Sequence, residues 1–183
     1  MKRLGILCLV LGLICGCNKP SESVDNSEKY RTYNELIIKN NYEESSYIPF
    51  DRELVVAENE KGEYVYDVVI SNPKVAMYRI EMIAVDVSQI GSEALFPCIG
   101  VLDDDHFHMI PNQSNPDEGF YSGITINGVS KTPNINLSVM VVYYDYYGLN
   151  ETKVFFNLSS DVESEVNLPD ENTEAGEDET YSE

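Results

Sequence analysis

Two runs of alternating side chains decide the fold: Ile135-Asn-Leu-Ser-Val-Met-Val-Val-Tyr-Tyr-Asp-Tyr146 and Thr152-Lys-Val-Phe-Phe-Asn-Leu158. In an extended chain, every second side chain points to the same side. One face of the first run then carries Ile135, Leu137, Val139, Val141 and Tyr143, and one face of the second carries Val154, Phe156 and Leu158. The segment Tyr147-Gly-Leu-Asn150 supplies a turn between them. The pattern therefore predicts two neighbouring strands that share a buried face.

The same pattern continues toward the N-terminus. Five further runs of β-branched and aromatic residues, separated by turn signals, are expected as strands: residues 52–58, 63–71, 74–87, 94–102 and 119–126. The expected core-facing residues are Tyr64, Tyr66, Val68 and Ile70 in the second of these runs, and Tyr78, Ile80, Met82 and Ala84 in the third. Between residues 48 and 159 no stretch shows sustained helical periodicity. The sequence thus predicts an all-β domain of about seven antiparallel strands over residues 48–159.

Two strand endings carry a resemblance to a known class of domain. One run ends Val68-Val-Ile-Ser-Asn-Pro73, and a later one ends Val142-Tyr-Tyr-Asp-Tyr-Tyr-Gly148. In this pattern the chain resembles the immunoglobulin-like domains of bacterial surface lipoproteins, which implies an immunoglobulin-like β-sandwich. The Cys and Trp landmarks of antibody domains are missing, and a small closed barrel of strands is the alternative fold.

The first 17 residues show a distinct pattern. A basic head, Met1-Lys-Arg3, is followed by an apolar run that ends in Ile14-Cys-Gly-Cys17. This resembles the signal peptide of bacterial lipoproteins. The resemblance implies that residues 1–16 are removed and that Cys17 becomes the lipidated new N-terminus, which anchors the protein to membrane lipid on the extracytoplasmic side. A transmembrane anchor needs about 20 apolar residues, more than this run offers, and an ordinary secretory peptide cleaved near Gly16 is the other alternative.

The regions on either side of the strands differ from them in composition. Residues 17–47 are expected to form a lipidated tether and a short cover segment: residues 18–29 are polar, and residues 30–42 place four apolar side chains near helical spacing, namely Tyr30, Tyr33, Ile37 and Ile38. Residues 160–183 are acidic and poor in apolar side chains. Such a segment cannot bury enough surface to offset its ordering entropy, so we predict a disordered acidic tail.

Charge and cysteine content limit the partners. The chain has 32 acidic and 12 basic residues and a net charge of −20. We therefore expect no nucleic-acid partner, since phosphate contacts need clustered Lys and Arg. Cys8 and Cys15 would leave with the signal peptide and Cys17 would carry lipid, so only Cys98 remains and no intramolecular disulfide is expected.

Both histidines of the chain lie in Asp103-Asp-Asp-His-Phe-His108. In an extended segment Asp104, His106 and His108 would share a side, which is a possible set of ligands for zinc or a similar cation. The alternative is a solvated loop between strands. Stronger metal motifs with paired ligand spacing are absent from the sequence.

Tyrosines cluster at the end of the first decisive run. Tyr144, Tyr146 and Tyr147 are candidates for an exposed aromatic surface that binds an extracytoplasmic protein, peptide or glycan, because tyrosine is a frequent contact residue in interfaces. Cross-strand packing is the alternative role.

Catalytic motifs are lacking: the sequence contains no nucleophile elbow, phosphate-binding glycine loop or zinc-peptidase helix. Cys98 lies in an apolar run and is expected to be a buried small side chain. We therefore expect a noncatalytic binding or accessory module without a cofactor. The alternatives are a metal-binding lipoprotein or metal-dependent enzyme that uses Asp104, His106 and His108, and a structural spacer that acts through its acidic tail.

Overall fold

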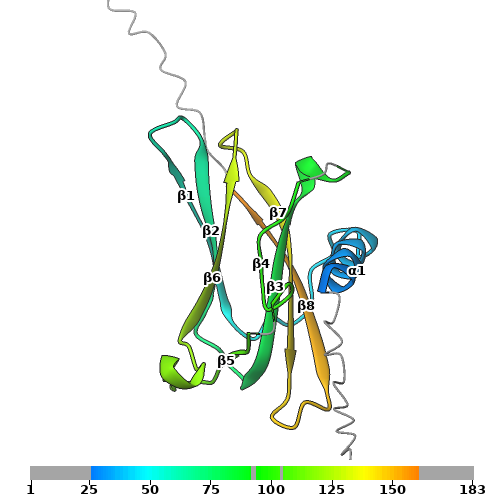
Figure 1. Ribbon diagram of the computed structural model, residues 1–183, viewed down its shortest axis with the longest axis vertical. Helices are drawn as coiled ribbons and strands as arrows, with labels where there is room; N and C mark the ends of the chain where they lie inside the picture. The colour runs from blue at the N-terminus through cyan, green and yellow to red at the C-terminus, as the bar shows by residue number, and fades with distance from the viewer. Residues whose placement is uncertain (1–25, 92–93, 104, 161–183) are drawn as a thin grey trace, which may run out of the picture.

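Two antiparallel β-sheets face each other in the computed structural model, which describes residues 26–91, 94–103 and 105–160 (Figure 1). The first sheet has the strand order β1 (Asp51–Glu58), β2 (Tyr64–Ser71) and β6 (Gly123–Ser130). The second has the order β4 (Cys98–Ile99), β3 (Met77–Asp86), β7 (Asn136–Tyr144) and β8 (Glu151–Ser159), and β5 (Phe107–Met109) also pairs with β3. The predicted all-β fold is confirmed at this level. In the described residues the strands form two separate sheets rather than the closed barrel that was the alternative.

The main core lies between the two sheets. The β7–β8 hairpin pairs in continuous register from Asn136–Ser159 to Tyr144–Glu151. All the residues predicted to face the core from residues 64–70, 135–143 and 154–158 lie in this cluster, fully buried or packed against it. The strand alternation read from the sequence is therefore confirmed for β2, β7 and β8.

A second core lies on the outer face of the five-stranded sheet. Helix α1 (Asn26–Lys39) covers this face (Figure 1) and buries Tyr33 and Ile37 there. The sheet residues beneath the helix are Ile83, Val85, Met140 and Val142. Because β3 and β7 are buried on both faces, their sequences read as continuous apolar runs rather than strict alternation. Within the described residues, no helix combines the length and apolar character that crossing a bilayer requires.

The helix starts earlier than the sequence predicts. Residues 26–29 were expected to belong to a tether, but α1 begins at Asn26. Two contacts to the loop after β4 hold this first turn: Asn26 Nδ2 donates to the carbonyl of Leu102, and Lys29 Nζ donates to the carbonyl of Gly100. The remaining tether, Cys17 and the signal peptide lie outside the described residues, as does the acidic tail after Ser160.

Two predicted strands differ from those observed. Of residues 94–102, only Cys98 and Ile99 form a strand with β3. On one side of them the amide of Phe96 donates to the Tyr30 hydroxyl of α1, and on the other side Gly100 has a left-handed backbone with φ 68°. The strand expected at residues 119–126 is β6, which starts at Gly123. Upstream of it, residues 116–118 form a short 3-10 helix, η2 (Pro116–Glu118), which ends at Gly119 in the left-handed region with φ 78°. Strand β5 forms where the sequence predicts a loop.

A bulge in β3 reverses the expected direction of one side chain. Arg79 has a left-handed backbone with φ 48°, and the register shifts between Tyr78 and Glu81. As a result Met77 and Ile80 both face the main core, and the prediction that Tyr78 shares a face with Ile80 is wrong. The Arg79 amide is satisfied by a side chain instead of a backbone carbonyl, since it donates to His108 Nδ1 of β5 at 2.9 Å.

The outer edge of β8 is covered by the segment that follows α1. The amide of Ser45 donates to the carbonyl of Phe155, and the amide of Phe155 donates to Ser45 Oγ, both at 2.9 Å. Asn157 adds two further bonds, from its amide to Glu44 Oε1 and from Nδ2 to the carbonyl of Tyr42. These bonds occupy backbone groups that an open edge would offer to another strand.

Candidate binding surface at the end of the sandwich

The turn between β7 and β8 is held by one carboxylate. Asp145 Oδ1 accepts the amide hydrogen of Leu149 at 2.9 Å, and Oδ2 accepts from Asn150 Nδ2. The amide of Gly148, which has φ 70°, donates to the carbonyl of Asp145 at 2.9 Å. These hydrogen bonds hold the pKa of Asp145 below its usual range. The turn is therefore fixed by its own polar groups.

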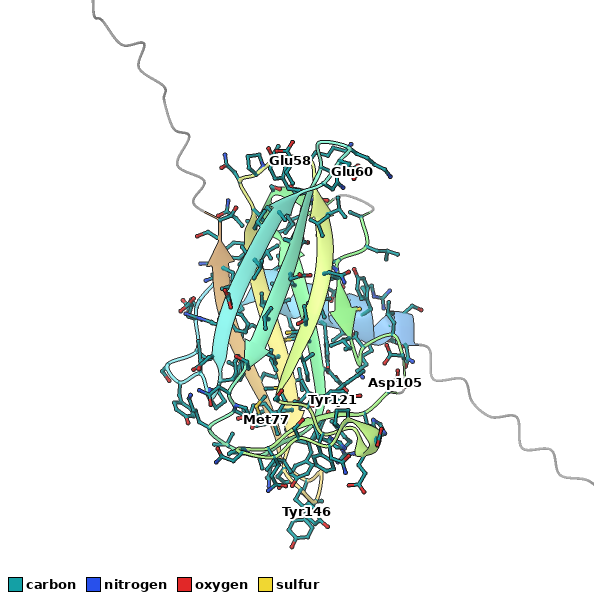
Figure 2. The ribbon with its side chains drawn as sticks, turned by 90° about the vertical axis from the view of Figure 1, so that its left-hand side faces the viewer. Glu58, Glu60, Met77, Asp105, Tyr121 and Tyr146 are labelled. Atoms are coloured by element: carbon teal, nitrogen blue, oxygen red, sulfur yellow. The ribbon has the colours of Figure 1, made fainter. Side chains whose placement is uncertain are left out.

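This turn presents three large side chains to solvent. Tyr146 is 73%, Tyr147 is 77% and Leu149 is 82% exposed. Figure 2 shows Tyr146 at the extreme end of the molecule, opposite the end where Glu58 and Glu60 lie. None of the three side chains contributes to either core. Packing in the folded domain therefore does not account for these side chains, and a contact with another molecule is the alternative.

The two exposed tyrosines continue inward through a series of ring contacts. The Tyr147 and Tyr146 ring centroids are 5.2 Å apart, and those of Tyr146 and Tyr78 are 5.5 Å apart, both in edge-to-face geometry. Behind Tyr78 lie Phe120 at 6.5 Å and His108 at 5.4 Å. We call these five residues the aromatic tip. Edge-to-face pairs at these distances are favourable, so the exposed rings rest on a packed base.

A groove of 590 Å³ runs beside the aromatic tip. Tyr78 and Phe120 form its aromatic side, and its polar lining includes Asn112, Gln113, Asn115 and Glu118. We call this the tip groove. Asn112 and Gln113 also line a neighbouring hollow of 490 Å³, so the concave surface continues past them.

The structure brings together two of the three predicted binding tyrosines. Tyr146 and Tyr147 lie in the aromatic tip, whereas Tyr144 is engaged elsewhere. The Arg79 guanidinium lies 4.9 Å from the centre of the Tyr144 ring, and the Tyr144 hydroxyl donates to Glu151 at 2.8 Å. Burial raises the pKa of Tyr144, and the nearby Glu81 carboxylate adds to this effect. Sequence reasoning did not group the tip-groove residues with the tyrosines, because the β3 bulge and the loop before β6 bring them together only in the folded chain.

A small polar cavity lies beside the first turn of α1. It has a volume of 160 Å³, and its lining includes Lys29, Arg79, Glu81, Asp105, His106 and Tyr144. Lys29 Nζ lies 2.7 Å from Glu81 Oε1, and the Tyr33 hydroxyl donates to Glu81 Oε2. Burial and this carboxylate raise the pKa of Tyr33 well above its usual range. The Glu81 carboxylate therefore joins α1 to β3.

The two candidate metal-binding histidines lie in different surroundings. His106 lines the polar cavity, whereas His108 belongs to the aromatic tip and its Nδ1 accepts the Arg79 amide hydrogen. Burial lowers the pKa of His108. Asp104 lies outside the described residues, and within residues 26–91, 94–103 and 105–160 no three His, Cys, Asp or Glu side chains are placed to share a metal ion. The set of Asp104, His106 and His108 stays a prediction.

Cys98 lies half-buried in β4 and packs against the core under α1. Burial raises the pKa of its thiol, which disfavours the thiolate that a nucleophile needs. This surrounding fits the expected role of a small packing residue.

Comparison of the chain with models of protein families, with curated proteins and with solved structures finds no match. The described residues themselves define the class: an all-β domain of two facing sheets with an aromatic surface at one end.

Proposed function

We propose that the protein is a membrane-anchored extracytoplasmic lipoprotein whose immunoglobulin-like β-sandwich acts as a noncatalytic binding module. The observation that carries the binding role is the exposure of Tyr146 and Tyr147 on a turn fixed by Asp145. Tyrosine offers a large contact area with few rotatable bonds. A preformed turn also reduces the ordering cost of binding.

The proposed anchor follows from the N-terminal sequence. The motif Ile14-Cys-Gly-Cys17 supplies the lipid acceptor, and two acyl chains give stable attachment where one does not. The segment from Cys17 to Asn26 spans at most about 30 Å when extended. A domain held this way stays close to the membrane surface.

Mass spectrometry of the detergent-extracted protein tests the anchor. We expect an N-terminal fragment that starts at Cys17 and carries a diacylglyceryl group, together with a membrane location in cell fractionation. Cys17→Ser is expected to abolish the lipid and the processing, whereas Cys98→Ser, the matched control, retains both. Native protein that keeps residues 1–16, or that begins at Cys17 with a free thiol, would refute the proposed anchor.

A metal-binding role is the second candidate, because Asp105 and His106 line one polar cavity. Zinc analysis of the full chain in detergent tests it. Stoichiometric zinc that is lost in His106→Ala, with a chelator lowering the melting temperature of the native protein only, would favour this role. Zinc-free protein whose melting temperature ignores the chelator would exclude zinc.

A further inference from the structure

We infer that the aromatic tip and the tip groove bind a neutral carbohydrate. This inference rests on the proposed binding function and names the class of its ligand. A sugar ring presents two kinds of surface, an apolar face of C–H groups and a rim of hydroxyls. A complementary site needs exposed aromatic rings next to side chains that both donate and accept hydrogen bonds.

The aromatic tip provides the rings. Tyr146 and Tyr147 are mostly exposed, and ring contacts connect them to Tyr78 and Phe120 on the wall of the groove. These rings extend from the β7–β8 turn to the wall of the groove. An apolar sugar face can pack on Tyr146 and Tyr147, because these two side chains are 73% and 77% exposed.

The tip groove provides the polar partners. Asn112, Gln113 and Asn115 each carry an amide, which offers two donor hydrogens and one acceptor oxygen. Glu118 adds a carboxylate acceptor. Sugar hydroxyls donate and accept in the same way, so this lining matches a hydroxyl-rich ligand better than it matches an apolar one. A protein-binding core, in contrast, is mostly apolar and depleted of acidic side chains.

Size and charge agree with a neutral chain of sugars. The groove volume of 590 Å³ falls within the usual range of ligand sites. The neighbouring hollow of 490 Å³ gives the surface room for more than one sugar unit. The net charge of −20 opposes polyanions and anionic lipid surfaces, whereas a ligand without charge is not repelled.

Affinity electrophoresis of the full chain in mild detergent tests this inference. The gels contain xyloglucan, galactomannan, mixed-linkage β-glucan or soluble starch. We expect at least one of these polysaccharides to retard the protein. Tyr146→Ala and Tyr147→Ala are each expected to weaken the apparent affinity about tenfold or more, as contact residues at a binding centre do. Tyr146→Phe keeps the ring and is expected to retain binding.

Two matched variants distinguish the loss of a stacking ring at the tip from the loss of any other exposed side chain. Leu149→Ala removes the third exposed side chain of the same turn, and Tyr47→Ala removes a 62% exposed tyrosine from the segment before β1. Neither is expected to change the retardation. Equal melting temperatures show that every variant is folded. The inference is overturned if no polysaccharide retards the protein, or if Leu149→Ala weakens binding as much as Tyr146→Ala.

A lipid surface is the competing ligand, and vesicle flotation measures it. The Cys17→Ser chain, which lacks the lipid acceptor, is mixed with vesicles of phosphatidylethanolamine and phosphatidylglycerol. If the protein floats with the vesicles and this depends on both Tyr147 and Leu149, the ligand of the aromatic tip is a lipid surface and not a carbohydrate. Failure of the anchor test leaves the gel result intact, because the gels use purified chain. Conversely, loss of carbohydrate binding in a correctly anchored protein would leave the lipoprotein proposal standing without this ligand.

Discussion

His108 connects the β3 bulge to the aromatic tip, because one ring nitrogen bonds to the bulge and the ring itself packs against the aromatic residues. Its Nδ1 accepts the amide hydrogen of Arg79, while its ring contacts Tyr78 and Phe120. An accepting Nδ1 requires the neutral ring with its proton on Nε2. His108, which the sequence suggests as a metal ligand, thus also satisfies the backbone amide of Arg79 in the left-handed region of β3.

This arrangement predicts a pH effect on stability. Burial lowers the pKa of folded His108, so the unfolded chain binds this proton more readily. The contribution of His108 is then complete above about pH 6.5 and is lost as the pH falls through its folded-state pKa. His108→Asn keeps an acceptor oxygen but does not titrate. We expect the melting temperature of the native protein, relative to His108→Asn, to fall between pH 7 and pH 5. If the effect follows His106→Asn instead, the assignment to His108 is wrong.

Gly100 offers a second residue-scale test, with Gly91 as its control. Both have positive φ, 68° and 85°, so alanine at either costs about 1 kcal/mol of backbone strain. A Cβ at Gly100 would also lie 2.7 Å from the carbonyl oxygen of Ile80, whereas one at Gly91 meets nothing within 4 Å. Gly100→Ala is therefore expected to lower the free energy of unfolding clearly more than Gly91→Ala in urea denaturation. Equal losses would contradict the close approach of the two backbones.

At the scale of elements, the attachment of α1 depends on Glu81. Tyr33 and Lys29 both bond to this carboxylate, whose side chain is only 12% exposed. Tyr33→Phe removes one bond to a poorly solvated charge and is expected to cost about 1–2 kcal/mol. In this variant, amide hydrogen exchange in α1 should be faster than in the native protein, whereas exchange in β7 should change less. Arg31→Gln, which removes only exposed ion pairs of the same helix, is expected to leave the exchange nearly unchanged.

Elements with regular local patterns could be predicted, and those formed by distant contacts could not. The strict alternation in β2, β7 and β8 follows from a pleated chain with one face in the core, so the sequence alone predicts it. The bulge at Arg79 depends on His108, 29 residues away in sequence. Beside the shortened β4, the amide of Phe96 bonds to Tyr30, 66 residues away. Neither partner is visible in the local pattern.

The same distinction holds for the candidate site. Tyr146 and Tyr147 could be chosen because they follow a strand and precede a turn, where side chains are often exposed. Tyr144 was grouped with them by sequence proximity, but the cation over its ring comes from β3. Tyr78 was expected inside the core, and only the bulge places it against Tyr146. The groove combines Tyr78 of β3 with residues 110–120 of the loop before β6, so no single stretch predicts it.

At the scale of the whole molecule, the net charge affects the stability of the fold. The full chain has a net charge of −20, and the excess of acidic over basic residues within residues 26–160 destabilises the compact state by self-repulsion, which dissolved salt screens. We expect added sodium chloride to raise the melting temperature at pH 7. The rise should shrink near the isoelectric point of about 4.2, where the net charge vanishes. An equal rise at both pH values would show that salt acts by another route than charge screening.

The position of α1 has a mechanical consequence. A pull applied to the chain ahead of Asn26 reaches the helix before any strand, and it meets the Lys29–Glu81 bond in the first turns. The helix lies on the outside of the sheet, so it can peel away turn by turn while the strands keep their pairing. Unravelling its 14 residues would lengthen the chain by about 28 Å, the difference between an extended and a helical rise. If the protein is anchored ahead of α1, this helix is expected to unfold under tension before the strands of the two sheets separate.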